Sequence, residues 1–167
     1  QALARRHQIS TEKRKFESHY GLGEILLKKV ILLTPLTYMN LSGLAVGSFL
    51  RYFQISSDSL IVLHDDLDLP WTRMRITNKG GAAGHKGLLS IIDQIQTREF
   101  IRIRLGIGRP PETIPPESYV LEPFSAEERK ELPLLIGRAC EAIEAIMEQG
   151  ISTAKNRFNV RESKTEG

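Results

Sequence analysis

The spacing of apolar side chains along the chain predicts buried strands that alternate with helices. Two short continuous apolar runs, over residues 28–33 (KKVILL) and 60–63 (LIVL), are typical of strands covered on both faces. Residues 100–107 (FIRIRLGI) alternate instead, with Ile and Leu on one face and Arg102 and Arg104 on the other. A shorter alternation over residues 73–77 predicts a half-exposed strand.

Helices are predicted between and after these strands. Apolar side chains have helical spacing over residues 41–53 and 87–95, and Ser125 opens a capping box that begins a long helix. Gly150 closes that helix, and a short helix over residues 152–159 follows it. This order of elements indicates an α/β fold with a largely parallel sheet, in which ligands gather at the carboxyl ends of the strands.

Composition narrows the class of protein. The chain has 167 residues, 41% hydrophobic and 26% charged, so we expect one globular domain over residues 1–167. The net charge of +3 and the isoelectric point near 9.1 permit an anionic partner. The single cysteine, Cys140, excludes an intrachain disulfide and fits a reducing intracellular setting. No apolar run is long enough to cross a bilayer, so we expect no membrane partner.

Two polar segments stand at element ends, where chemistry on a polar substrate is usual. Residues 64–68 (HDDLD) directly follow the second apolar run, and the glycine-rich turn 80–87 (GGAAGHKG) opens a helix. Glycines ahead of a helix can hold a phosphate or carboxylate on backbone amides, although this turn lacks the spacing of a dinucleotide fingerprint. His85, taken alone, is read as a structural histidine bonded to backbone. Neighbouring side chains on a strand point in opposite directions, so residues 64–68 do not readily converge on a metal, and we expect neither metal nor cofactor.

Five segments occur in an order and at a spacing that match a known family. They are residues 35–43 (PLTYMNLSG), 64–70 (HDDLDLP), 84–88 (GHKGL), 102–110 (RIRLGIGRP) and 154–159 (AKNRFN). Together they closely resemble peptidyl-tRNA hydrolase of the bacterial type. The resemblance implies a three-layer sandwich around a twisted, mixed, largely parallel sheet. It also implies an esterase that cleaves the peptide from the 3′ ribose of tRNA, binding the acceptor end and the peptide. We expect a monomer in the cytoplasm or, in a eukaryote, in an organellar stroma or matrix.

The resemblance also implies roles for single residues. Asp65 matches the aspartate that orients the family's histidine base, whereas from the residues alone it would be a carboxylate capping a turn. Asn40 matches a substrate-binding asparagine, and its alternative is the N-cap of the following helix. Tyr38 matches a residue of the tRNA-end pocket, where its ring could stack on a base, or it is a half-buried structural tyrosine. Arg104 matches an arginine that grips acceptor-stem phosphate, and Arg102 could add attraction to RNA.

Two departures from the family pattern bear on activity. The family's first strand, its glycine-asparagine-proline turn and the segment that carries the histidine base have no match, and we read Gly21–Gly23 as a hairpin turn. We therefore expect a further segment ahead of Gln1, because a sheet without its central strand would expose a wide apolar seam. Lys86 stands where the family has an asparagine, and it brings a charge and three donors but no acceptor. It could pair with Asp65 or attract tRNA phosphate.

These residues leave two hypotheses of different classes. The first is an active peptidyl-tRNA hydrolase that recycles tRNA during translation and carries its base in the segment ahead of Gln1. The second is a non-catalytic RNA-binding relative that keeps a basic groove and has lost the base. A histidine-containing motif upstream would distinguish the first from the second.

Overall fold

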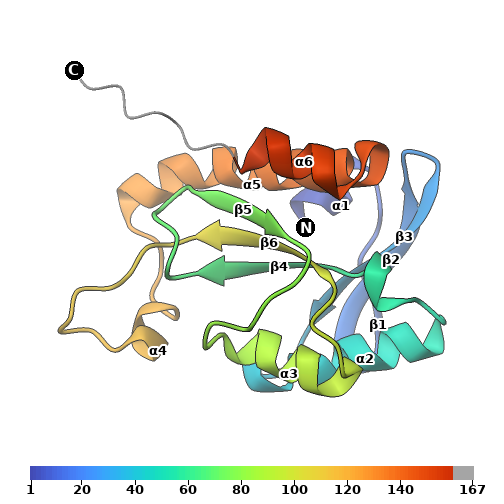
Figure 1. Ribbon diagram of the computed structural model, residues 1–167, viewed down its shortest axis with the longest axis horizontal. Helices are drawn as coiled ribbons and strands as arrows, with labels where there is room; N and C mark the ends of the chain where they lie inside the picture. Colours follow the sequence, from blue (N-terminus) through green and yellow to red (C-terminus); the bar gives the residue numbers. More distant parts are fainter. Residues whose placement is uncertain (160–167) are drawn as a thin grey trace. The chain divides into compact units, whose positions relative to one another are not determined.

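The computed structural model describes residues 1–159 as an α/β protein of two compact units (Figure 1). The first unit comprises Gln1–Val62 and Asn78–Ile101, and the second comprises Leu63–Thr77 and the described residues from Arg102 onward. The first holds α1 (Ala2–Arg6), β1 (Lys13–Lys15), β2 (Ser18–Ile25), β3 (Lys28–Pro35), η1 (Met39–Leu41), α2 (Ser42–Tyr52), η2 (Ser57–Ser59) and α3 (Lys86–Ile95). The second holds β5 (Met74–Thr77), α4 (Pro116–Tyr119), α5 (Ala126–Gln149) and α6 (Ile151–Phe158), with most of β4 (Ile61–Asp66) and β6 (Ile101–Gly106). The expectation of a single domain over residues 1–167 stays a prediction.

The first unit contains the antiparallel sheet β1-β2-β3. The turn between β2 and β3 consists of Leu26 and Leu27, whose φ angles of 50° and 62° are those of a two-residue primed turn. Our reading of Gly21–Gly23 as a hairpin turn is therefore wrong, because both glycines lie inside β2. Their role is close packing: a Cβ on Gly23 would lie 2.5 Å from the Ile9 side chain. A sequence pattern cannot reveal this requirement, since Ile9 approaches β2 from outside the hairpin.

The second sheet has the order β4-β6-β5, with β6 in the centre. Leu60 O accepts from Ile101 N at 3.0 Å and Asp66 O accepts from Ile107 N at 3.1 Å, so β4 and β6 are parallel, as their arrows in Figure 1 show. β5 runs antiparallel to β6. The sheet β4-β6-β5 is thus mixed, as expected. The three other pairings in the described sheets are antiparallel, so the parallel share is smaller than the apolar runs suggest.

Arg102 corrects one expectation about β6. It was expected on an exposed polar face, yet it is only 2% exposed. A side chain on a strand is buried by whatever packs on that face of the sheet, and the alternation of the strand does not show this covering. The Arg102 side chain is therefore not available for direct contact with RNA at the surface.

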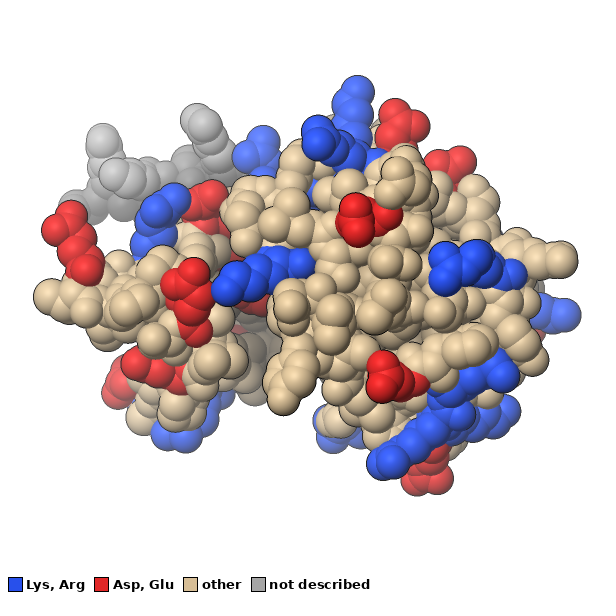
Figure 2. Space-filling model, turned by 90° about the horizontal axis from the view of Figure 1, so that it is seen from below, with Lys and Arg blue, Asp and Glu red and all other residues tan. Residues whose placement is uncertain are grey.

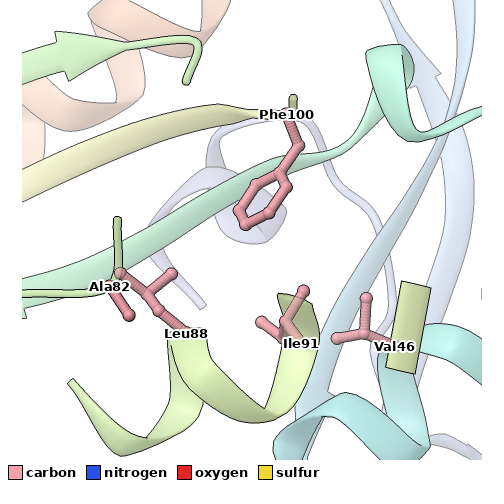
Figure 3. Packing of buried hydrophobic residues seen from close by; sticks show 5 residues of the cluster. All are labelled: Val46, Ala82, Leu88, Ile91 and Phe100. Atoms are coloured by element: carbon pink, nitrogen blue, oxygen red, sulfur yellow. The ribbon is translucent and has the colours of Figure 1, made fainter. Parts of the chain in front are cut away.

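The core of the first unit joins α2, α3 and Phe100, the residue directly before β6. Figure 3 shows Val46, Ala82, Leu88, Ile91 and Phe100, which form one buried cluster. Phe100, at 1% exposed, is its largest fully buried side chain. Ala82 belongs to this cluster although it comes from the glycine-rich turn, so the core fixes the turn that leads into α3.

Local signals in the sequence predicted α5 and α6 of the second unit, but not the short α4. Ser125 and Glu128 form the expected capping box, with each side chain bonded to the other residue's backbone N–H, and Gly150 follows the last residue of α5.

Asn159, directly after α6, binds the edge of β5: its side chain accepts from Ile76 N at 2.7 Å and donates to Ile76 O at 2.9 Å. One asparagine thereby replaces a neighbouring strand at a sheet edge.

None of the helices within residues 1–159 combines the length and apolar character that a membrane crossing requires.

Candidate functional site

The turn before α2 carries two residues expected to bind substrate. Tyr38 precedes η1 and is 82% exposed, so it is not the half-buried structural tyrosine of the alternative reading. Asn40 lies inside η1 and is also exposed. It is not an N-cap, because the N-cap of α2 is Leu41. Hydrogen bonds from Leu41 N to Tyr38 O and from the Ser42 hydroxyl to Met39 O, both 2.9 Å, hold the turn. The Asn40 amide bonds to no residue between 1 and 159, which leaves its donors and acceptor for a ligand.

Close packing of α2 on α3 fixes this turn. Gly43 N donates to the Ser90 hydroxyl at 2.9 Å, and a Cβ on Gly43 would lie 2.0 Å from Ser90 O. Met39 lies over Gly87, where a Cβ would lie 2.6 Å from the Met39 sulfur. Glycines therefore let the backbone that carries Asn40 approach α3 directly.

Two neighbouring residues at the start of α3 differ in role: one caps the helix, and the other is exposed to solvent. His85 is the N-cap, and its Nδ1 accepts from Leu88 N at 3.2 Å, which confirms the structural interpretation. Lys86 is the next residue, is exposed, and has no acidic partner within residues 1–159. A cation at a helix N-terminus faces the positive end of the helix dipole, so a nearby anion would stabilise it.

The carboxyl end of β4 carries Asp65, which is half-buried. The carbonyl oxygen of Asp65 lies 2.7 Å from Nδ1 of His64. Because a carbonyl only accepts, Nδ1 carries the proton in this contact, and that ring nitrogen of His64 is bonded to backbone.

Asp66 has a structural role that the sequence did not reveal. It is 8% exposed, its Oδ1 accepts from Asp68 N at 2.9 Å, and its Oδ2 accepts from Nε of Arg104 at 2.5 Å. The turn-capping role considered for Asp65 thus belongs to the next residue. Strand alternation could have suggested that the two carboxylates face opposite ways, but not which of them is buried.

The other acidic residue of this segment is also paired. Asp68 forms an exposed ion pair with Arg109, in the loop after β6. Within the described part of the chain, no group of three or more His, Cys, Asp or Glu is placed to hold a metal ion.

The five candidate residues divide between the two units. Tyr38, Asn40 and Lys86 belong to the first, and Asp65 and Arg104 belong to the second. Each lies at a helix start, in a turn or near a strand end. These are the kinds of position at which functional residues are expected from the sequence. Sequence reasoning missed Thr37, whose Oγ1 is buried without a hydrogen-bond partner in the described residues, directly beside Tyr38.

Comparison with known proteins identifies the family. A sequence model described as peptidyl-tRNA hydrolase matches residues 1–166. The chain belongs to the peptidyl-tRNA hydrolase family. A peptidyl-tRNA hydrolase of Chloroflexus aurantiacus is 42% identical over 158 residues, which cover 94% of this chain and 84% of the relative. One from Shouchella clausii is 44% identical over 156 residues, covering 93% and 84%.

Solved structures of the family share the fold. The crystal structure of peptidyl-tRNA hydrolase from Acinetobacter baumannii matches with a TM-score of 0.89 at 31% identity, over 95% of this chain and 81% of that one. A complex of peptidyl-tRNA hydrolase with N-propanol matches with the same TM-score. The α/β fold expected from the sequence resemblance is confirmed at this level.

Proposed function

We propose that this protein hydrolyses the ester bond between peptide and tRNA in peptidyl-tRNA, and so recycles tRNA during translation. The observation that carries the proposal is identity of 42% and 44%, over more than nine-tenths of the chain, to proteins named peptidyl-tRNA hydrolase. Water adds to the ester carbonyl carbon, the bond from that carbon to the 3′ oxygen breaks, and the products are a peptide acid and tRNA with a free 3′ hydroxyl. We expect the protein to act as a monomer, in the compartment where translation takes place.

Asp65 is proposed as the orienting acid. A histidine base removes a proton from the attacking water, and a carboxylate beside it stabilises the resulting imidazolium; such assistance contributes about 10²–10⁴-fold. Of the histidines near the candidate residues, His85 caps α3 and His64 contacts the backbone of Asp65. Neither of these two histidines is therefore proposed as the base.

The remaining candidates are proposed to hold the tRNA end and the peptide. The Asn40 amide can donate to the ester carbonyl or to a phosphate without competing as a base. Tyr38, at 82% exposed, offers a ring face for stacking on a base. Lys86 and Arg104 are proposed to attract phosphate groups. Lys and Arg side chains are interspersed with Asp and Glu on the face shown in Figure 2. The net charge of +3 suits RNA contacts that do not depend on sequence.

The test is hydrolysis of N-acetyl-aminoacyl-tRNA by the full-length protein. We expect Asp65→Ala to lower the rate about 100-fold or more, because it removes the carboxylate that stabilises the imidazolium. Asp58→Ala, which removes an exposed acid from η2, is the matched control and should leave the rate unchanged. A folded protein that binds tRNA but never releases the peptide would refute the proposal and support the non-catalytic relative. In that outcome, Lys86→Asn tests whether the lysine is the cause.

A further inference from the structure

The guanidinium of Arg104 is hydrogen-bonded within the protein through its Nε, whereas its two terminal amino groups remain for a ligand. Its Nε donates to Asp66 at 2.5 Å, and its side chain is 23% exposed. The terminal amino groups bond to no residue between 1 and 159. A guanidinium has five donors in a rigid plane, so an anchor at Nε fixes the direction of the other four.

Asp66 is a rigid anchor for this plane. Its side chain is only 7% exposed, and both carboxylate oxygens are bonded, to Asp68 N and to Arg104. Its backbone oxygen accepts from Ile107 N, just after β6. The carboxylate is therefore held by β4, by the turn that follows, and by the strand that carries Arg104.

We propose that Asp66 is a positioning residue for phosphate recognition, acting through Arg104. By fixing Nε, Asp66 aims the two terminal amino groups of Arg104 outward as a fork that binds two oxygens of one tRNA phosphate group. This inference rests on the proposed function, because it takes the phosphate contact of Arg104 from there. The inference adds that the Arg104–phosphate contact depends on the orientation of the guanidinium and not only on its charge. Binding of the anionic phosphate then requires a buried acidic residue, Asp66.

The direction in which Asp66→Asn changes the affinity for tRNA distinguishes this proposal from an effect of net charge alone. Asp66→Asn removes a negative charge, so if charge alone mattered it would strengthen tRNA binding. If Asp66 positions Arg104, the same change weakens binding, because a charge-assisted bond that fixes the guanidinium is lost. The amide keeps an oxygen for Asp68 N, which favours a folded variant. Asp68→Asn is the matched control, since it removes an equal charge from the exposed pair with Arg109.

The experiment measures the Kd of deacylated tRNA and the KM for N-acetyl-aminoacyl-tRNA. We expect Asp66→Asn to raise both about tenfold, as for one charge-assisted hydrogen bond, with kcat within about twofold of wild type. Asp68→Asn should not weaken binding. In an Arg104→Lys background, Asp66→Asn should cause no further loss, because a lysine has no fork to aim. If Asp66→Asn does not fold, Asp66→Glu, which keeps the charge and displaces the anchor, replaces it with the same expected loss.

Unchanged or tighter tRNA binding by Asp66→Asn would overturn the inference, and so would equal losses in the wild-type and Arg104→Lys backgrounds. Because tRNA binding is measured without hydrolysis, a protein that binds tRNA but does not cleave the ester would refute the proposed function alone.

Discussion

Substitution of Gly43 by alanine gives the clearest stability prediction, because the added methyl group would clash with the backbone of α3. A Cβ on Gly43 would lie 2.0 Å from Ser90 O and 2.8 Å from Ile91 N, so α2 and α3 must separate by roughly 1 Å or more to admit it. Overpacking of this kind costs about 1–3 kcal/mol. Loss of the Gly43–Ser90 hydrogen bond adds about 1 kcal/mol, and the better helix propensity of alanine returns about the same. We expect Gly43→Ala to be destabilised by about 2 kcal/mol.

Gly47, one turn later in α2, is the matched control. A Cβ there would lie 3.2 Å from Nη1 of Arg51, the end of a flexible side chain, so Gly47→Ala should gain about 0.5–1 kcal/mol from helix propensity. Urea unfolding of both variants measures the difference, which we expect to be about 3 kcal/mol. Peptide release should slow in Gly43→Ala, because Asn40 directly precedes α2, in η1, and Lys86 begins α3. Equal stability of the two variants would show that the close approach of α2 and α3 does not require glycine.

Three further predictions concern single interactions and are measured by urea unfolding. Asn159→Ala leaves N–H and C=O of the buried Ile76 unpaired and should cost about 2–4 kcal/mol, whereas Asn156→Ala, on the exposed face of α6, should cost little. Leu27→Gly should stabilise by about 1 kcal/mol, because Leu27 is 91% exposed and has a φ of 62°, which glycine adopts without strain. Ser125→Ala removes the cap of α5 and should cost about 1 kcal/mol, with a loss below 0.3 kcal/mol counting against the capping box.

The parts of the fold that follow from neighbours in sequence were predictable. The capping box at Ser125 and the glycine at position 150 fix both ends of α5, since each signal acts within one helical turn. β1 and β2 were missed, because Gly21 and Gly23 look like turn residues and their actual constraint comes from Ile9. The hairpin turn instead contains two leucines, which no turn preference would suggest.

The candidate site was predictable to the level of segments, and less so to the level of single side chains. The motif around Asn40 could indicate a ligand-binding asparagine, but an N-cap had the same sequence signature, and only the position of Leu41 at the N-cap separates them. Arg102 and Arg104 share one face of an alternating strand, yet one is buried and the other reaches solvent. Burial at the centre of a sheet depends on what covers that sheet, and the strand's own pattern does not contain this information.

In each of the two units, residues that are neighbours in the sequence have opposite roles, and this limits what a single substitution can show. His85 bonds to the backbone of α3 while Lys86 has no acidic partner in the described residues, and Asp66 anchors Arg104 beside the proposed catalytic Asp65. A loss of activity on changing His85 or Asp66 would therefore reflect displaced neighbours as readily as lost chemistry. The two causes differ in their readouts. A displaced neighbour weakens substrate binding or lowers stability, whereas removal of a group that acts on the ester lowers kcat in a protein that still folds and binds tRNA.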